Sequence, residues 1–186
     1  LMMMLMAAVG AWAGDVQLQD ADGTKFVNMP YTGTDNLTLP DASVMAFKVY
    51  DNGGAEGNYS DASDGYLLIT APDGFALQLS GSIQTEANYD FLTVYDGTTN
   101  EATMLFESSG NLTDIGSIAS TGRNLLLRFR SDNGTNGEGL NLDVTLFNPN
   151  EAFSIIINET TGGVMHCSKG TAKYNEEITL TWTHET

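Results

Sequence analysis

Three acidic residues stand beside predicted β-strands, at positions where their carboxylates could act together. Glu86 and Asp90 lie four residues apart, directly before an alternating run at 91–95. Asp132 follows a second alternating run at 125–130 and opens a loop rich in Gly and Asn. Loops of a β-sandwich gather at the two ends of its sheets, so the three carboxylates are predicted to converge at one end.

Carboxylates that are packed together repel one another, and a bound cation removes that cost. Hard oxygen ligands suit Ca²⁺, which takes about 6–8 oxygens, of which three carboxylates supply about three to five. Backbone carbonyls of the loop at 133–137 and water would supply the rest. Mg²⁺ fits less well because it requires strict octahedral geometry. The alternative is a solvated acidic rim, since an acid-rich chain also clusters carboxylates by chance.

Catalytic interpretations find little support in the sequence, and we predict a protein that is not an enzyme. A glycosidase pair made of Glu86 and Asp90 would need a deep sugar cleft, and the sequence lacks the extra loops to build one. No nucleophile elbow, HExxH zinc motif or phosphate-binding loop occurs. The loop after Ser131 does not fit an EF-hand. Gly134 would stand at the third position, which requires Asp or Asn, and Asp143 at the twelfth, which requires Glu.

Short alternating runs, separated by Gly, Asn, Asp and Ser, predict an all-β fold. The clearest run has Leu140, Leu142, Val144 and Leu146 on one face and polar residues on the other. The predicted strands cover 44–50, 66–70, 75–81, 91–95, 104–107, 125–130 and 140–147.

The pattern predicts four segments along the chain. Residues 1–14 resemble the remnant of a signal peptide, with a cleavage site at Ala11-Trp12-Ala13 and a mature start near Gly14. Residues 15–43 are a polar lead or an edge strand, 44–148 are the main β-domain, and 149–186 start a partial small β-domain after an Asn-Pro-Asn break. We expect the chain to be a fragment of a longer protein.

Composition restricts the partners. The 186 residues carry 24 Asp and Glu against 7 Lys and Arg, a formal net charge of −17. This charge excludes a nucleic-acid footprint and disfavours anionic membrane surfaces, whereas cations and partners that present Lys or Arg are favoured.

The single cysteine, Cys167, cannot form an intrachain disulfide, which favours an exported bacterial protein over a eukaryotic secreted module. The apolar start is too short to insert into a membrane.

Three tracts together resemble a CUB domain, most closely the cysteine-free CUB-like modules of bacterial secreted proteins. They are YDNGGAEGNYS at 50–60, TEANYDFLTVYDG at 85–97 and LLLRFRSDNGTNGEGLNLDV at 125–144. The resemblance covers about residues 44–148 and implies a β-sandwich of two antiparallel sheets. It also implies a Ca²⁺ site made of Glu86, Asp90, Asp132 and a carbonyl of Asn133.

This sequence departs from the family pattern in two places. Only three residues separate Glu86 from Asp90, and the supporting Tyr that often follows the N-Y-P stretch is absent or replaced by Tyr59 or an acid. The tail resembles, more weakly, small bacterial β-repeats of the Ig-like kind.

We therefore expect a secreted or cell-surface recognition module that binds protein or carbohydrate, through Lys or Arg of the partner, with Ca²⁺ ordering its loops. Tyr59 and Tyr89 are the candidate partner contacts. Two alternatives remain open. One is an accessory module of a secreted hydrolase or protease, and the other is a structural adhesin spacer.

Overall fold

The computed structural model describes residues 14–158 and 162–184, so the predicted signal-peptide segment lies almost entirely outside the described residues. Every regular element in those residues is a β-strand. Within the same residues, no helix has the length and apolar character needed to cross a membrane. The chain divides after Phe147 into two compact units, which are described separately.

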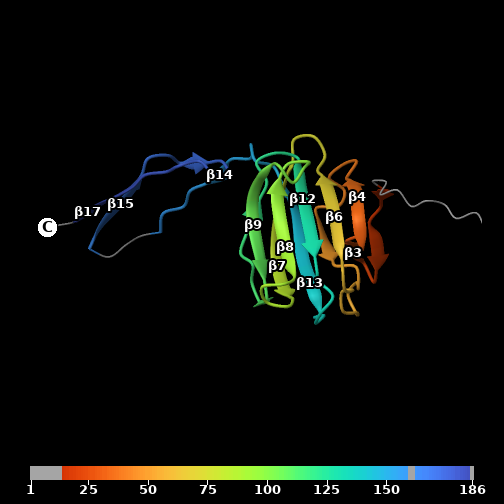
Figure 1. The fold of residues 1–186 in the computed structure, drawn as a ribbon. Coiled ribbons are helices and arrows are strands. Elements are labelled where there is room, and N and C mark those ends of the chain that lie inside the picture. The colour runs from red at the N-terminus through yellow and green to blue at the C-terminus, as the bar shows by residue number, and fades with distance from the viewer. Residues whose placement is uncertain (1–13, 159–161, 185–186) are drawn as a thin grey trace, which may run out of the picture. The chain divides into compact units, whose positions relative to one another are not determined.

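The first unit is a sandwich of two β-sheets (Figure 1). Sheet A has the strand order β1-β4-β6-β12-β8-β9, and sheet B has the order β10-β7-β13-β5-β3-β2, with β11 also pairing with β7. The strands of sheet A are β1 Gly14–Val16, β4 Thr32–Thr38, β6 Asp64–Thr70, β12 Asn124–Arg130, β8 Phe91–Asp96 and β9 Thr103–Ser109. Those of sheet B are β10 Asn111–Leu112, β7 Ala76–Gln84, β13 Gly139–Phe147, β5 Ala46–Tyr50, β3 Thr24–Asn28, β2 Gln19–Ala21 and β11 Ile118–Ala119.

The predicted all-β sandwich is confirmed, but its sheets are mixed and not antiparallel throughout. The pairs β1–β4, β4–β6 and β3–β5 are parallel. Strands β3, β4, β5 and β6 alternate between sheets B and A, so strands that become neighbours are joined through the opposite sheet. Such crossover connections produce parallel pairs, whereas hairpins produce antiparallel ones.

Residues 15–43 contribute more than the polar lead or edge strand that the sequence predicted. They hold β2, β3, β4 and most of β1, so they extend both sheets. Val27 on β3 and Leu37 on β4 are buried in the core. This segment is therefore part of the sandwich.

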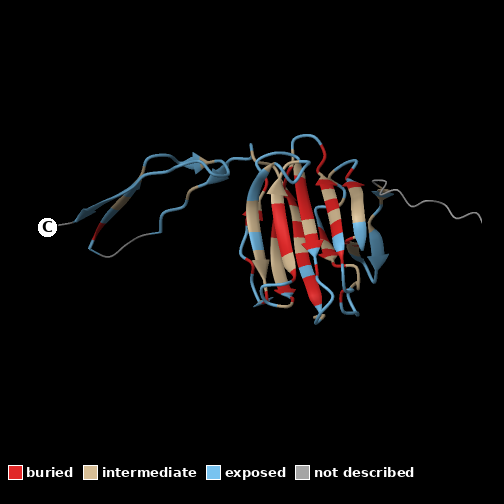
Figure 2. Cartoon of the chain, in the orientation of Figure 1, coloured by how far each residue is buried: buried red, intermediate tan, exposed pale blue. Residues whose placement is uncertain are grey.

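The core lies between the two sheets, and the predicted alternation places the right residues in it. Leu140, Leu142 and Val144 on β13 are buried, as are Leu127 and Phe129 on β12. Figure 2 shows the buried residues concentrated along the central strands of the sandwich. Polar side chains of these strands therefore line the outer faces of the two sheets.

The second unit consists of two small two-stranded sheets. They pair β14 (Phe153–Ser154) with β16 (Thr171–Ala172) and β15 (Gly163–Cys167) with β17 (Leu180–His184). Gly163 is the one buried residue in the described part of this unit. His166 and Cys167 are neighbours on β15, where successive side chains point to opposite faces.

Candidate functional site

Glu86 and Asp90 begin and end a tight turn between β7 and β8. The backbone N–H groups of Tyr89 and Asp90 donate to the Glu86 carbonyl, at 3.3 and 3.1 Å. Asn88, inside the turn, has φ of 70°, a left-handed conformation in which Asn is enriched. The Thr85 hydroxyl donates to the Asp90 carbonyl at 2.9 Å, which fastens the turn to the end of β7.

The structure brings the three predicted carboxylates together. Glu86, Asp90 and Asp132 each offer a carboxylate oxygen, and these oxygens lie within 4.8 Å of one another. The backbone N–H of Asp132 donates to Asp90 Oδ1 at 2.9 Å, which anchors the loop that follows β12. Asp90 is only 1% exposed, whereas Asp132 is exposed, so the cluster opens to solvent on one side.

The loop after Asp132 folds back over the cluster. The N–H of Gly134 donates to Asp132 Oδ1 at 2.7 Å, and the N–H of Thr135 donates to Glu86 Oε2 at 3.1 Å. Asn133, the predicted carbonyl ligand, is exposed and lies between Asp132 and Gly134 in this loop.

Gly134 keeps the space between two of the carboxylates open. A methyl group at this position would lie 2.8 Å from Asp132 Oδ1 and 2.9 Å from Glu86 Oε2. Each carboxylate retains free lone pairs beside the hydrogen bonds that it already accepts. Oxygen donors around such an open position fit a hard cation such as Ca²⁺.

Tyr59 supports the cluster from inside the domain. Its hydroxyl donates to Asp90 Oδ2 at 2.5 Å and accepts the Glu86 N–H at 3.0 Å, and its ring packs edge-on against Phe129 with centroids 5.0 Å apart. The sequence analysis gave Tyr59 as a candidate partner contact. Tyr59 is only 2% exposed, so its side chain is not available to a partner. Tyr89, the other candidate contact, is 57% exposed.

The tyrosine hydroxyl makes stability depend on alkaline pH. Burial, and then the hydrogen bond to Asp90, raise the pKa of Tyr59 to about 12. The folded pKa exceeds the unfolded value, so the folded state holds this proton more tightly. The resulting stability is present below pH ~10 and is lost as the pH rises toward about 12.

We expect the free energy of unfolding to fall by about 2 kcal/mol across that pH window for this reason. Urea unfolding between about pH 9 and pH 12 measures the loss. Tyr59→Phe should lack this component, and it should also be less stable at neutral pH because it loses the hydrogen bonds to Asp90 and to the Glu86 N–H. Equal pH slopes for the two proteins would contradict the assignment.

Asp51 is a second buried carboxylate, which the sequence analysis included only as part of the tract at 50–60. It is fully buried, and its two oxygens accept the N–H groups of Gly53 at 2.8 Å and Leu140 at 2.7 Å. Burial raises the pKa of Asp51 above its usual value, and the hydrogen bonds from the two backbone donors offset only part of this rise. The carboxylate ties the end of β5 to the start of β13. No local pattern marks this role, because the contact joins residues 89 positions apart.

Comparison with known proteins supports the architecture. No family model matches the chain. Cubilin of Canis lupus familiaris is 31% identical over 138 residues, which make up 72% of this chain and 3% of cubilin. The chain therefore spans a small part of this curated relative.

Comparison with solved structures supports the fold through one match. The CUB1-EGF-CUB2 domain of human MASP-1/3 matches with a TM-score of 0.50 and 14% identity, over 73% of this chain and 55% of that one. The full extracellular region of zebrafish Gpr126/Adgrg6 matches with a TM-score of 0.48 and 18% identity, over 69% of this chain and 17% of that one.

Proposed function

Because the chain contains a CUB-like domain, we propose that it is a non-catalytic recognition module in which Ca²⁺ orders the partner-binding loops. CUB-like domains are extracellular recognition and protein-interaction modules, and this general class supports the proposal. The cation, the partner and the non-catalytic role for this chain are our proposal.

The observation that carries the proposal is the convergence of three carboxylates around the position that Gly134 leaves open. Glu86, Asp90 and Asp132 would hold the cation, and the carbonyl of Asn133 would add a ligand. When bound, Ca²⁺ supplies the positive charge that offsets the repulsion among the carboxylates. The loop at 132–135 already hydrogen-bonds to the same side chains, so its conformation is tied to theirs.

The partner would be a protein that presents Lys or Arg to this end of the domain. Tyr89 is exposed beside the cluster, and the net charge of −17 attracts basic surfaces. A secreted or cell-surface location is part of the same proposal, supported by the extracellular setting of CUB homologues. Bacterial origin is proposed from the single cysteine.

Calorimetric Ca²⁺ titration of the whole chain, beside melting in Ca²⁺ and in EDTA, tests the cation site. At about 100 times the Kd, binding should add about 2.7 kcal/mol to the free energy of unfolding and raise the melting temperature. Asp132→Ala should abolish binding. Gly134→Ala should weaken it, because the new methyl group displaces two carboxylates.

Gly122→Ala is the matched control, since a methyl group there meets nothing within 4 Å. The control variant should bind Ca²⁺ as the unchanged protein does. No heat and no shift in melting temperature for the unchanged protein would overturn the cation site and leave the CUB-like fold intact.

A further inference from the structure

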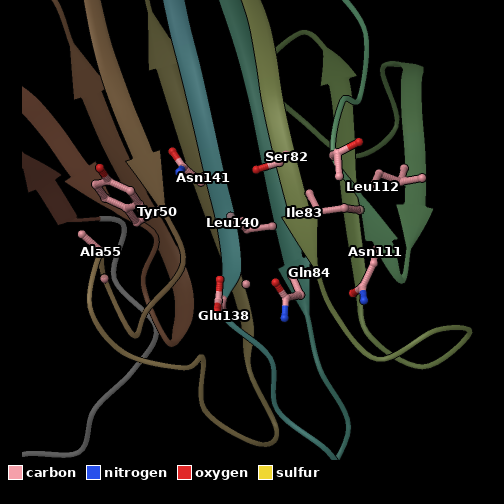
Figure 3. Close-up of a pocket in the computed structure, with 13 residues that line it drawn as sticks. Tyr50, Ala55, Ser82, Ile83, Gln84, Asn111, Leu112, Glu138, Leu140 and Asn141 are labelled. Atoms are coloured by element: carbon pink, nitrogen blue, oxygen red, sulfur yellow. The ribbon is translucent and has the colours of Figure 1, made fainter.

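A second feature is a polar groove on the outer face of sheet B, with a volume of about 340 Å³ (Figure 3). It lies over β5, β13 and β7, between the loop at 54–55 and the segment at 111–113. None of the three clustered carboxylates lines it. The side chains that matter here are Tyr50, Ser82, Gln84, Asn111, Glu138 and Asn141.

The sheet register arranges these side chains in two rows. Asn141 pairs with Tyr50 on one side and with Ser82 on the other, so the three form one row across β5, β13 and β7. Neighbouring strands lie about 4.8 Å apart, which gives the row a length of about 10 Å. Gln84 pairs with Asn111 in the next row. This extent suits a short chain of ring-sized units better than a single small ion.

The lining chemistry matches hydroxyl groups. The amides of Gln84, Asn111 and Asn141 each donate and accept hydrogen bonds, as does the Ser82 hydroxyl, and sugar hydroxyls do both. Tyr50 adds an aromatic ring at one end of the row, where a sugar could present its C–H face.

Two of these groups are held in place before any ligand arrives. The Lys48 ammonium donates to Asn141 Oδ1 at 3.0 Å, which leaves the Asn141 NH₂ group as the donor for a ligand. Lys48 is itself paired with Asp143 at 2.8 Å. The Tyr50 ring packs edge-on against Phe26, with centroids 6.0 Å apart. Such preorganisation lowers the entropic cost of binding.

The charges of the lining residues select the ligand class. Glu138 is the one charged residue among the described residues of the groove, and it is acidic. The cation that contacts the lining, Lys48, is already paired with Asp143, so an anionic ligand would meet the Glu138 carboxylate without a cation to offset it. A peptide would find few exposed apolar side chains to anchor it. We propose that this groove binds a short stretch of a neutral, hydroxyl-rich glycan, in addition to the function proposed above and independently of the cation.

A glycan array of neutral oligosaccharides and their sulfated or sialylated counterparts, probed with the whole chain in EDTA, tests this proposal. We expect binding to neutral members and none to the anionic counterparts. Titration of one neutral trisaccharide hit, followed by NMR, should then shift the amides of Ser82, Gln84 and Asn141.

Asn141→Ala and Gln84→Ala should each weaken that trisaccharide about tenfold, the effect of one lost hydrogen bond. Both residues are exposed, so the fold should survive the changes. Thr145→Ala is the matched control, four residues along β13 on the same outer face, and it should leave affinity unchanged. Binding in EDTA supports the groove whatever the Ca²⁺ titration shows.

Three results would overturn the proposal. They are no binding to any neutral glycan, affinity that Asn141→Ala and Gln84→Ala leave unchanged, and a basic peptide, not a saccharide, that shifts the groove amides.

Discussion

Replacing Phe129 with alanine should destabilise the first unit by about 3–5 kcal/mol, the usual cost of truncating a fully buried aromatic side chain. Phe129 is 1% exposed and lies on β12, which pairs with β6 on one side and β8 on the other. Its ring also packs against Tyr59, so the cavity would open directly behind the hydroxyl that holds Asp90 and Glu86. The variant should therefore lose cation affinity as well as stability.

Urea unfolding of the unchanged protein and of Phe129→Ala, followed by far-UV circular dichroism, measures the loss of stability. Ca²⁺ titration of the same two proteins measures the loss of cation affinity. Met104→Ala is the control, because Met104 is 55% exposed on the edge strand β9 and should change stability by about 0.5 kcal/mol or less. A loss for Phe129→Ala no larger than that of the control would contradict the packing described here.

The strands with regular alternation were predictable from the sequence. The runs at 91–95, 125–130 and 140–147 appear as β8, β12 and β13, with the alternate apolar residues buried. These strands carry their own signal, because apolar residues on the core-facing side alternate with mostly polar residues on the other side.

The strands before residue 44 carry no such signal. Strand β4 reads TGTDNLT and offers one buried apolar residue, Leu37, yet it pairs along its whole length with β6. Its place is set by neighbours that are already buried, and tertiary context overrides weak local propensity in sheets. The three parallel pairings depend on crossovers between the sheets, which no local pattern specifies.

The candidate site, like the fold, was only partly predictable from the sequence. Glu86, Asp90 and Asp132 were predicted to share one end of the sandwich because the strands that carry them were recognised, and their carboxylates do lie together. Their use as metal ligands stays a prediction. Support of the cluster by Tyr59 was one of the alternatives that the family resemblance left open, and its hydroxyl does bind Asp90. The role of Asp51 could not be predicted, because it acts through a contact between segments that are remote in sequence.

Gly139 gives the second large effect, since its replacement by alanine should cost about 2–5 kcal/mol. The residue opens β13 with φ of 79°, a conformation that costs a residue with a Cβ about 1–2 kcal/mol. The added methyl group would also lie 1.9 Å from Asp51 Oδ2. The carboxylate would have to leave the buried N–H of Leu140, and an unpaired buried donor costs about 1–3 kcal/mol more.

Two other glycines separate these contributions. Gly74 has φ of 84° with nothing within 4 Å of an added methyl group, so Gly74→Ala should show the backbone cost alone. Gly122→Ala has neither the positive φ nor the clash and should be close to neutral. Urea unfolding should therefore rank the losses as Gly139→Ala, then Gly74→Ala, then Gly122→Ala. Equal losses at Gly139 and Gly74 would mean that Asp51 adapts without cost, and that the link between β5 and β13 contributes little to the stability of this end of the domain.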